Sequence, residues 1–134
     1  MSSIRTTRPA PSLAAIALVA LLTHAAAAQE GFPLDGTWRG SYGPVGENLV
    51  PVVLVMKWDG RTINGTINPG PASMPFEHAV LDPSDWTLSV EARTAGGEQI
   101  VIEGTLRNIG AYDRRVEGTW TQNGAAYDFR MVRQ

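Results

Sequence analysis

Cysteine is absent from the 134-residue chain, and this absence excludes several classes of protein. No disulfide can brace the fold, and no thiol chemistry is possible. A lipid cannot be attached to a new N-terminal cysteine either, because no cysteine follows the hydrophobic start of the chain. Stability therefore has to come from a packed core and from strand pairing.

Positive charge is scarce after residue 28, where nine basic and thirteen acidic side chains give a net charge of −4. Nucleic acids and anionic membranes both select basic surfaces, since binding to them depends on attraction to phosphate groups or anionic lipids. The composition therefore argues against both classes of partner.

Histidine is scarce as well, and His78 is the only one after residue 28. Neighbouring Glu77 is expected on the opposite face of a strand, and no Asp, Glu or His cluster has the spacing of metal ligands. No nucleophile and base can be paired. The sequence thus predicts no catalytic residue, no metal site, no cofactor and no enzyme activity.

The first 28 residues have the three parts of a signal peptide. Arg5 and Arg8 form a basic start, residues 13–22 form an apolar run, and small residues occupy 25–28. The run is too short to span a bilayer stably. We expect cleavage after Ala28, no membrane anchor afterwards, and a periplasmic or secreted product that forms a single domain, 29–134, of ordinary size.

No segment after residue 28 has a helical period, and apolar and polar residues alternate as they do in half-buried strands. The alternation predicts eight strands. Seven of them are 36–43, 50–58, 61–68, 75–81, 86–93, 99–107 and 114–122, and a last strand after Asn123 and Gly124 carries Tyr127, Phe129 and Met131.

Short links between these strands favour an up-and-down meander. Asp59–Gly60 and Asn123–Gly124 have the composition of tight hairpin turns, of type I′ for Asp59–Gly60. Closing the meander into an antiparallel β-barrel removes both exposed edges and places the apolar face inside. Inward glycines such as Gly65 and Gly118 would let the strands coil and leave room for neighbouring rings.

A Gly-x-Trp sequence that ends at Trp38 opens the first strand, and this resembles the start of lipocalins and of the wider calycin group that includes avidins. In lipocalins this Trp closes one barrel end against a basic residue late in the chain. The resemblance therefore implies that Trp38 contacts Arg130 or Arg133. Biotin binding is not implied, because Gly40 stands where avidins have a polar contact. The Thr-Asp-Tyr motif, the cysteines and the late helix of lipocalins are absent.

Four tryptophans suggest a binding site for a small apolar ligand, since all four fall on the inferred inner face. The candidate ligand-binding residues are Trp38, Trp58, Trp86, Trp120, Tyr127 and Phe129. The same rings could instead fill the interior, because an eight-stranded barrel is barely wide enough for its own side chains.

Two functions therefore remain open, and an enzyme with a site at a barrel mouth ranks behind both because no nucleophile, base and metal can be grouped. The first is an exported lipocalin-like binding protein for a small hydrophobic ligand. The second is a packed-barrel structural or protein-interaction module that docks through outward residues such as Val53, Val55 and Val101. The volume enclosed by the barrel separates the two, and the oligomeric state is left open by the sequence.

We expect the exported protein to begin at Gln29 or within a residue or two of it, because the small-residue run ends there and β structure begins soon afterwards. Mass spectrometry of the product purified from outside the cytoplasm checks this. Retention of Met1 or of residues 13–22 would contradict it.

Overall fold

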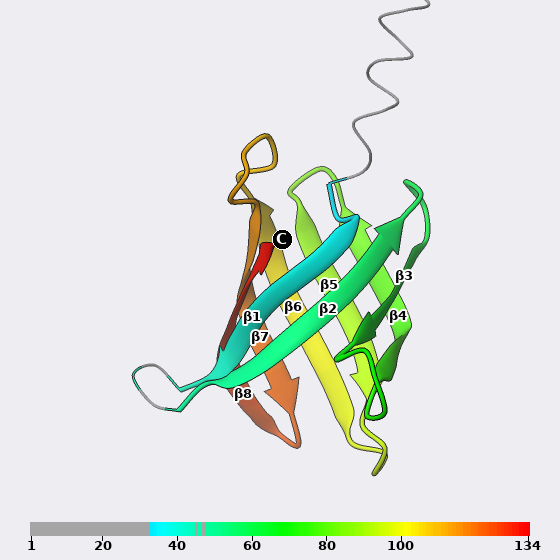
Figure 1. The fold of residues 1–134 in the computed structure, drawn as a ribbon, viewed down its shortest axis with the longest axis vertical. Helices are drawn as coiled ribbons and strands as arrows, with labels where there is room; N and C mark the ends of the chain where they lie inside the picture. The colour runs from blue at the N-terminus through cyan, green and yellow to red at the C-terminus, as the bar shows by residue number, and fades with distance from the viewer. Residues whose placement is uncertain (1–32, 45, 47) are drawn as a thin grey trace, which may run out of the picture. The chain divides into compact units, whose positions relative to one another are not determined.

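Eight strands make up the part of the chain that the computed structural model describes, residues 33–44, 46 and 48–134. They are β1 (Gly36–Gly43), β2 (Val50–Trp58), β3 (Ile63–Ile67), β4 (Met74–Asp82), β5 (Thr87–Arg93), β6 (Gln99–Arg107), β7 (Arg115–Gln122) and β8 (Ala125–Arg133). Each pairs antiparallel with the next, and β8 pairs with β1 (Figure 1). The predicted eight-stranded up-and-down barrel is confirmed. The predicted signal peptide, 1–28, and the predicted domain start lie outside the described residues.

The two predicted hairpin turns differ in their backbone. Asn123 and Gly124 both have positive φ, 54° and 77°, as a type I′ turn requires. At the other turn only Gly60 has positive φ, and the Asp59 carboxylate accepts hydrogen bonds from the N–H groups two and three residues further on. The link is therefore a longer loop, β3 is shorter than the predicted 61–68, and the type I′ prediction at Asp59 is wrong.

A β-bulge in β4 breaks the alternation of that strand. The register against β5 shifts by one residue between Phe76 and His78. As a result Phe76 and Leu81 both pack in the core although they are an odd number of residues apart. Glu77 and His78 are both exposed. The prediction that these two side chains take opposite faces is wrong, because the extra residue turns both outward.

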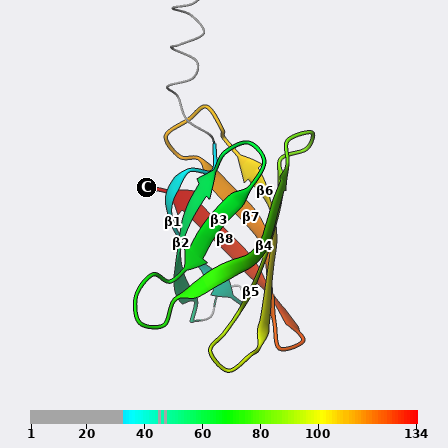
Figure 2. The ribbon, with the colours of Figure 1, turned by 90° about the vertical axis from the view of Figure 1, so that its right-hand side faces the viewer.

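The wall between β3 and β4 is the most sparsely paired part of the barrel. Only Thr66 with Pro75 and Ile67 with Met74 are in register there. The two strands meet at one end and diverge toward the other (Figure 2). The ring of Phe76 occupies this wall, and a Cβ on Gly65 would run into it. Glycine at this position thus provides the predicted space for a neighbouring ring.

Close backbone approach explains another inward glycine. Gly104 and Gly118 lie opposite each other in the β6–β7 pair. A Cβ on Gly118 would overlap the carbonyl oxygen of Glu103, which is backbone and cannot move aside alone. The sheet can coil tightly at this point only because no side chain is present.

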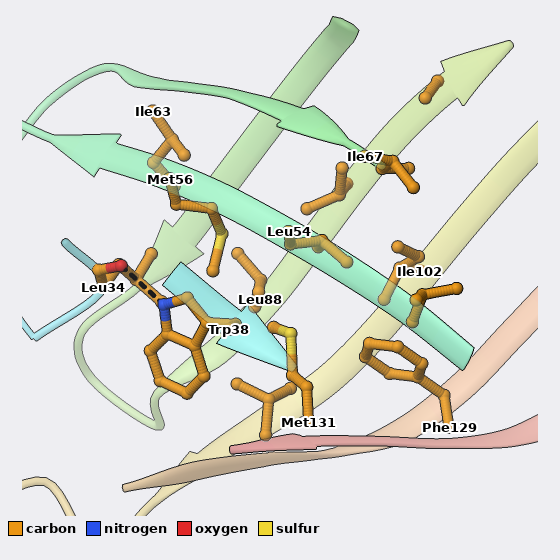
Figure 3. Packing of buried hydrophobic residues seen from close by; sticks show 14 of the residues in the cluster. Leu34, Trp38, Leu54, Met56, Ile63, Ile67, Leu88, Ile102, Phe129 and Met131 are labelled. Atoms are coloured by element: carbon orange, nitrogen blue, oxygen red, sulfur yellow. Dashed lines mark hydrogen bonds between the residues drawn. The ribbon is translucent and has the colours of Figure 1, made fainter. Parts of the chain in front are cut away.

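One hydrophobic core fills the barrel. Nineteen buried apolar side chains form a single cluster, and seven partly buried ones pack against it. Figure 3 shows Leu54 and Met56 of β2 directed toward the same interior as Met131 and Phe129 of β8. No polar or charged side chain is buried among the described residues. The interior is thus packed as in other small barrels whose side chains fill the lumen.

The chain segment before β1 closes the barrel end at which β1 begins, which we call the lead end. Leu34 and Trp38 are completely buried, and the Trp38 indole N–H donates to the Leu34 carbonyl oxygen at 2.8 Å (Figure 3). The Asp35 carboxylate accepts from the backbone N–H of Trp58 at 2.6 Å. The backbone carbonyl oxygen of Asp35 accepts from Nε of Arg133 at 2.5 Å. The lead end is therefore sealed by hydrogen bonds as well as by packing.

Of the two arginines that the lipocalin resemblance offers, Arg133 lies at the lead end. It is the cross-strand neighbour of Trp38, whereas Arg130 lies opposite Ser41 on the exposed face. A second guanidinium, that of Arg114, donates to the Pro33 carbonyl oxygen at 2.8 Å. Burial, and then repulsion from Arg133, lowers the pKa of Arg114.

Replacing Trp38 by Ala should destabilise the barrel strongly. The side chain is completely buried, so truncation leaves a cavity under Leu34 and removes the hydrogen bond to its carbonyl oxygen. We expect Trp38→Ala to lower the free energy of unfolding by about 3–5 kcal/mol in urea titrations. The control Val55→Ala, at an exposed position of the adjacent strand, should change it by less than about 0.5 kcal/mol. Similar losses of unfolding free energy in the two variants would contradict the role of Trp38 in closing the lead end.

Candidate ligand-binding site

The four tryptophans do not form one site. Trp38, Trp58 and Trp86 lie toward the lead end, whereas Trp120 lies toward the opposite end, where the β7–β8 turn is found. Trp38 and Trp58 are buried in the core. Trp86 has positive φ, 58°, and precedes β5 instead of belonging to it as predicted, although its ring still packs partly buried on the core. The four indole rings are therefore not grouped together inside the barrel.

Three of the predicted residues come together at the end opposite the lead end, which we call the mouth. Trp120 and Tyr127 are cross-strand neighbours in the β7–β8 pair. The rings of Trp120 and Phe129 are 5.9 Å apart between centroids and tilted by 42°. Trp120 and Phe129 are buried, whereas Tyr127 is half-buried. Of these three rings, Tyr127 is therefore the one that solvent reaches.

Tyr42 of β1 completes this cluster and was missed as a site residue. Its ring lies flat on that of Trp120, with centroids 4.2 Å apart and planes 3° apart, and it lies 5.9 Å from the Tyr127 ring. Tyr42 is the cross-strand neighbour of Phe129. That pairing joins the first and last strands, so no local pattern reveals it. The only sign of Tyr42 in the sequence was that it shares one face of its strand with Trp38.

A hydrogen-bonded chain fixes the Trp120 ring from the rim. Its indole N–H donates to the Gln122 side-chain oxygen at 3.0 Å, and the Gln122 amide donates to a Glu98 carboxylate oxygen, also at 3.0 Å. Glu98 comes from the β5–β6 loop and Gln122 ends β7. Both polar residues were also missed: Glu98 lies in a loop, where no periodicity places its side chain, and nothing in the strand pattern links Gln122 to it.

An open hollow of about 440 Å³ lies at the mouth. Its walls are formed by the half-buried rings of Tyr42 and Tyr127 together with rim residues, namely Gly43, Pro44, Asn48, Val50, Glu98, Gln122 and Asn123. Two other hollows, of about 390 and 460 Å³, lie on the outer wall and have no exposed aromatic side chain. The mouth is therefore where aromatic faces and polar groups border the same space.

The environment of Tyr42 changes its acidity. Burial raises the pKa of the Tyr42 phenol, and the nearby phenol of Tyr127 raises it further because two negative charges would repel each other. Both causes favour the neutral ring at physiological pH. The aromatic wall of the hollow is then uncharged at Tyr42.

Charged side chains elsewhere are dispersed over the outer face. Glu117 pairs with Arg107 and Arg115 at 3.4 and 3.3 Å, and Arg93 pairs with Glu77 at 3.3 Å. In residues 33–44, 46 and 48–134 no three His, Asp or Glu side chains are grouped to hold a metal ion. None of the described residues belongs to a helix long and apolar enough to cross a membrane.

Comparison with known proteins adds no family to this picture. No family model and no curated protein matches the chain. The lipocalin resemblance at Trp38 therefore remains a prediction, and the shared property is the eight-stranded closed barrel. The assignment of a function has to rest on the geometry of the mouth.

Ionisation of Tyr42 should destabilise the fold at alkaline pH. Because its pKa is raised, the folded protein keeps the proton at a pH where the unfolded chain loses it. Stability from this group is complete below pH 10.0, the usual pKa, and falls as the pH rises above it. We expect the urea midpoint of the parent to fall more steeply above that pH than that of Tyr42→Phe, which keeps the ring on Trp120. An equal slope in both proteins would refute this.

Proposed function

We propose that this is an exported binding protein, without catalytic activity, for a small molecule with an apolar face, which it holds at the mouth of the barrel. The observation that carries the proposal is the stack of Tyr42 on Trp120 beside the half-exposed Tyr127, at the wall of a hollow of about 440 Å³. Ligand sites begin at about 300 Å³ and combine aromatic walls with a few polar groups.

The filled core argues for the mouth over the lumen that lipocalin-like binding implies. Trp38 and Trp58 are buried among other core side chains and lie toward the lead end. A ligand in their place would have to displace side chains whose burial stabilises the barrel. At the mouth, by contrast, the exposed parts of Tyr42 and Tyr127 gain contacts without any loss from the core.

Each residue of the mouth has a separate role in this proposal. Trp120 supports the Tyr42 ring from below, and Gln122 and Glu98 hold Trp120 in place through hydrogen bonds. Tyr127 stands at an angle to Tyr42 and forms the second wall. A ring held in place before binding loses little side-chain entropy when the ligand arrives, which favours affinity.

The packed interior also supports the second candidate, a protein-interaction module. Its docking surface would need revision, however, because β2 and β6 are four strands apart in the closed eight-stranded ring. Val53 and Val55 on β2 therefore lie on the wall opposite Val101 on β6, and only Val55 of the three is exposed. These valines form no common patch, so the mouth is the better-supported site.

An NMR titration with benzyl alcohol, a neutral aromatic probe, tests the proposal. We expect the backbone signals of Tyr42 and Tyr127 and the indole N–H of Trp120 to shift, while the indole N–H of Trp38 stays in place. Loss of one ring contact in Tyr127→Ala should weaken binding by about 1 kcal/mol, or roughly fivefold. The matched control is Tyr112→Ala, since Tyr112 is fully exposed in the β6–β7 loop. Shifts confined to the core, or none at all, would overturn the proposal.

A further inference from the structure

The polar lining of the mouth hollow has a single sign of charge. Among the described residues that line it, Glu98 is the only carboxylate and there is no Lys, Arg or His. One Glu98 oxygen, Oε2, accepts the hydrogen bond from Gln122. The other oxygen, Oε1, has no partner among the described residues, and the side chain lies at the exposed rim. The hollow therefore offers an anionic oxygen without a basic group to neutralise it.

The aromatic walls favour the same charge in a ligand. The faces of the Tyr42 and Tyr127 rings carry partial negative charge and attract cations. Alkylated ammonium groups are well suited to such walls, since their methyl groups make apolar contact while their charge is attracted to the ring.

An anionic ligand is disfavoured by the same geometry. A carboxylate in the hollow would meet Glu98 without a compensating cation from the lining. Fatty acids and similar apolar anions, which suit an apolar lumen with a basic entrance, therefore do not fit this mouth. The charge of the lining thus separates ligand classes that the aromatic rings alone would not separate.

We propose that the mouth binds an organic cation with an alkylated ammonium group, which packs on Tyr42 and Tyr127 and is paired with Glu98. This inference rests on the proposed function, because it names the ligand class of the same site. The hydroxyl and amide groups of Tyr127, Asn48 and Asn123 are then left to contact the polar part of the ligand at the rim.

The test compares choline with its neutral isostere, in which a tert-butyl group replaces the trimethylammonium group. Both are titrated into the mature protein and followed by NMR at Tyr42, Tyr127 and the Trp120 indole N–H. The two probes have the same shape and differ in charge, so we expect choline to bind roughly tenfold more tightly. Added salt should weaken choline binding and leave the isostere unaffected.

A charge-removing variant locates the counter-ion. Glu98→Gln retains an oxygen that can accept from Gln122, so it should weaken choline by about three- to fivefold and leave the isostere unchanged. Glu103→Gln is the matched control, because Glu103 is exposed on the outer face of β6 and does not line the hollow. A variant that weakens both probes equally would show that Glu98 acts through Trp120 and not as a counter-ion, which overturns the inference.

The two proposals fail in different ways. If the isostere binds as tightly as choline, the ligand class is wrong and the mouth remains a site for apolar molecules. If choline, the isostere and benzyl alcohol all leave the signals of the mouth unchanged, both proposals are overturned.

Discussion

The pairing of β1 with β8 is the constraint on which both ends of the barrel depend. Their register joins Trp38 to Arg133 at one end and Tyr42 to Phe129 at the other. The first contact brings the Arg133 guanidinium to the Asp35 carbonyl oxygen. The second places the Tyr42 ring on Trp120 of β7. A sheet that failed to close would expose two edges and would lose the hydrogen bonds of the β1–β8 pair, the sealed lead end and the aromatic mouth together.

Among the described residues, a chain segment lies across the lead end, and this distinguishes it from the mouth. At the lead end Leu34 is completely buried over the core, and Arg114 and Arg133 use backbone carbonyl oxygens as partners. At the mouth the cover is made of rings, and Tyr42 and Tyr127 remain half-buried. This asymmetry supports the mouth as the site of the proposed function, since the filled core and the covered lead end offer no comparable aromatic surface among the described residues.

Alternation along the chain was enough to predict β1, β2 and β6 and the fold as a whole, because half-buried strands repeat every two residues. It failed where one residue breaks the period. The bulge beside His78 reverses the facing within β4, and the positive φ of Trp86 removes that residue from β5. The site was harder to predict than the fold. Tyr42 contacts Trp120 only because the barrel closes, and Glu98 contacts Gln122 from a loop. Neither contact leaves a local pattern in the sequence.

A filled barrel of this size separates the residues that stabilise it from those available for recognition. Core residues such as Trp38 cannot vary without leaving a cavity. The exposed side chain of Glu98 and the exposed face of Tyr127 contribute little to the core, so they are the groups available to contact the proposed ligand. Trp120 belongs to both groups, since it is buried and also supports Tyr42. If the mouth binds a ligand as proposed, replacing Trp120 would lower stability and binding together, whereas Glu98→Gln, which keeps an acceptor for Gln122, would alter binding with little effect on the core. In the proposed function the rim thus decides the specificity of the mouth, and the core beneath it decides the shape of the mouth.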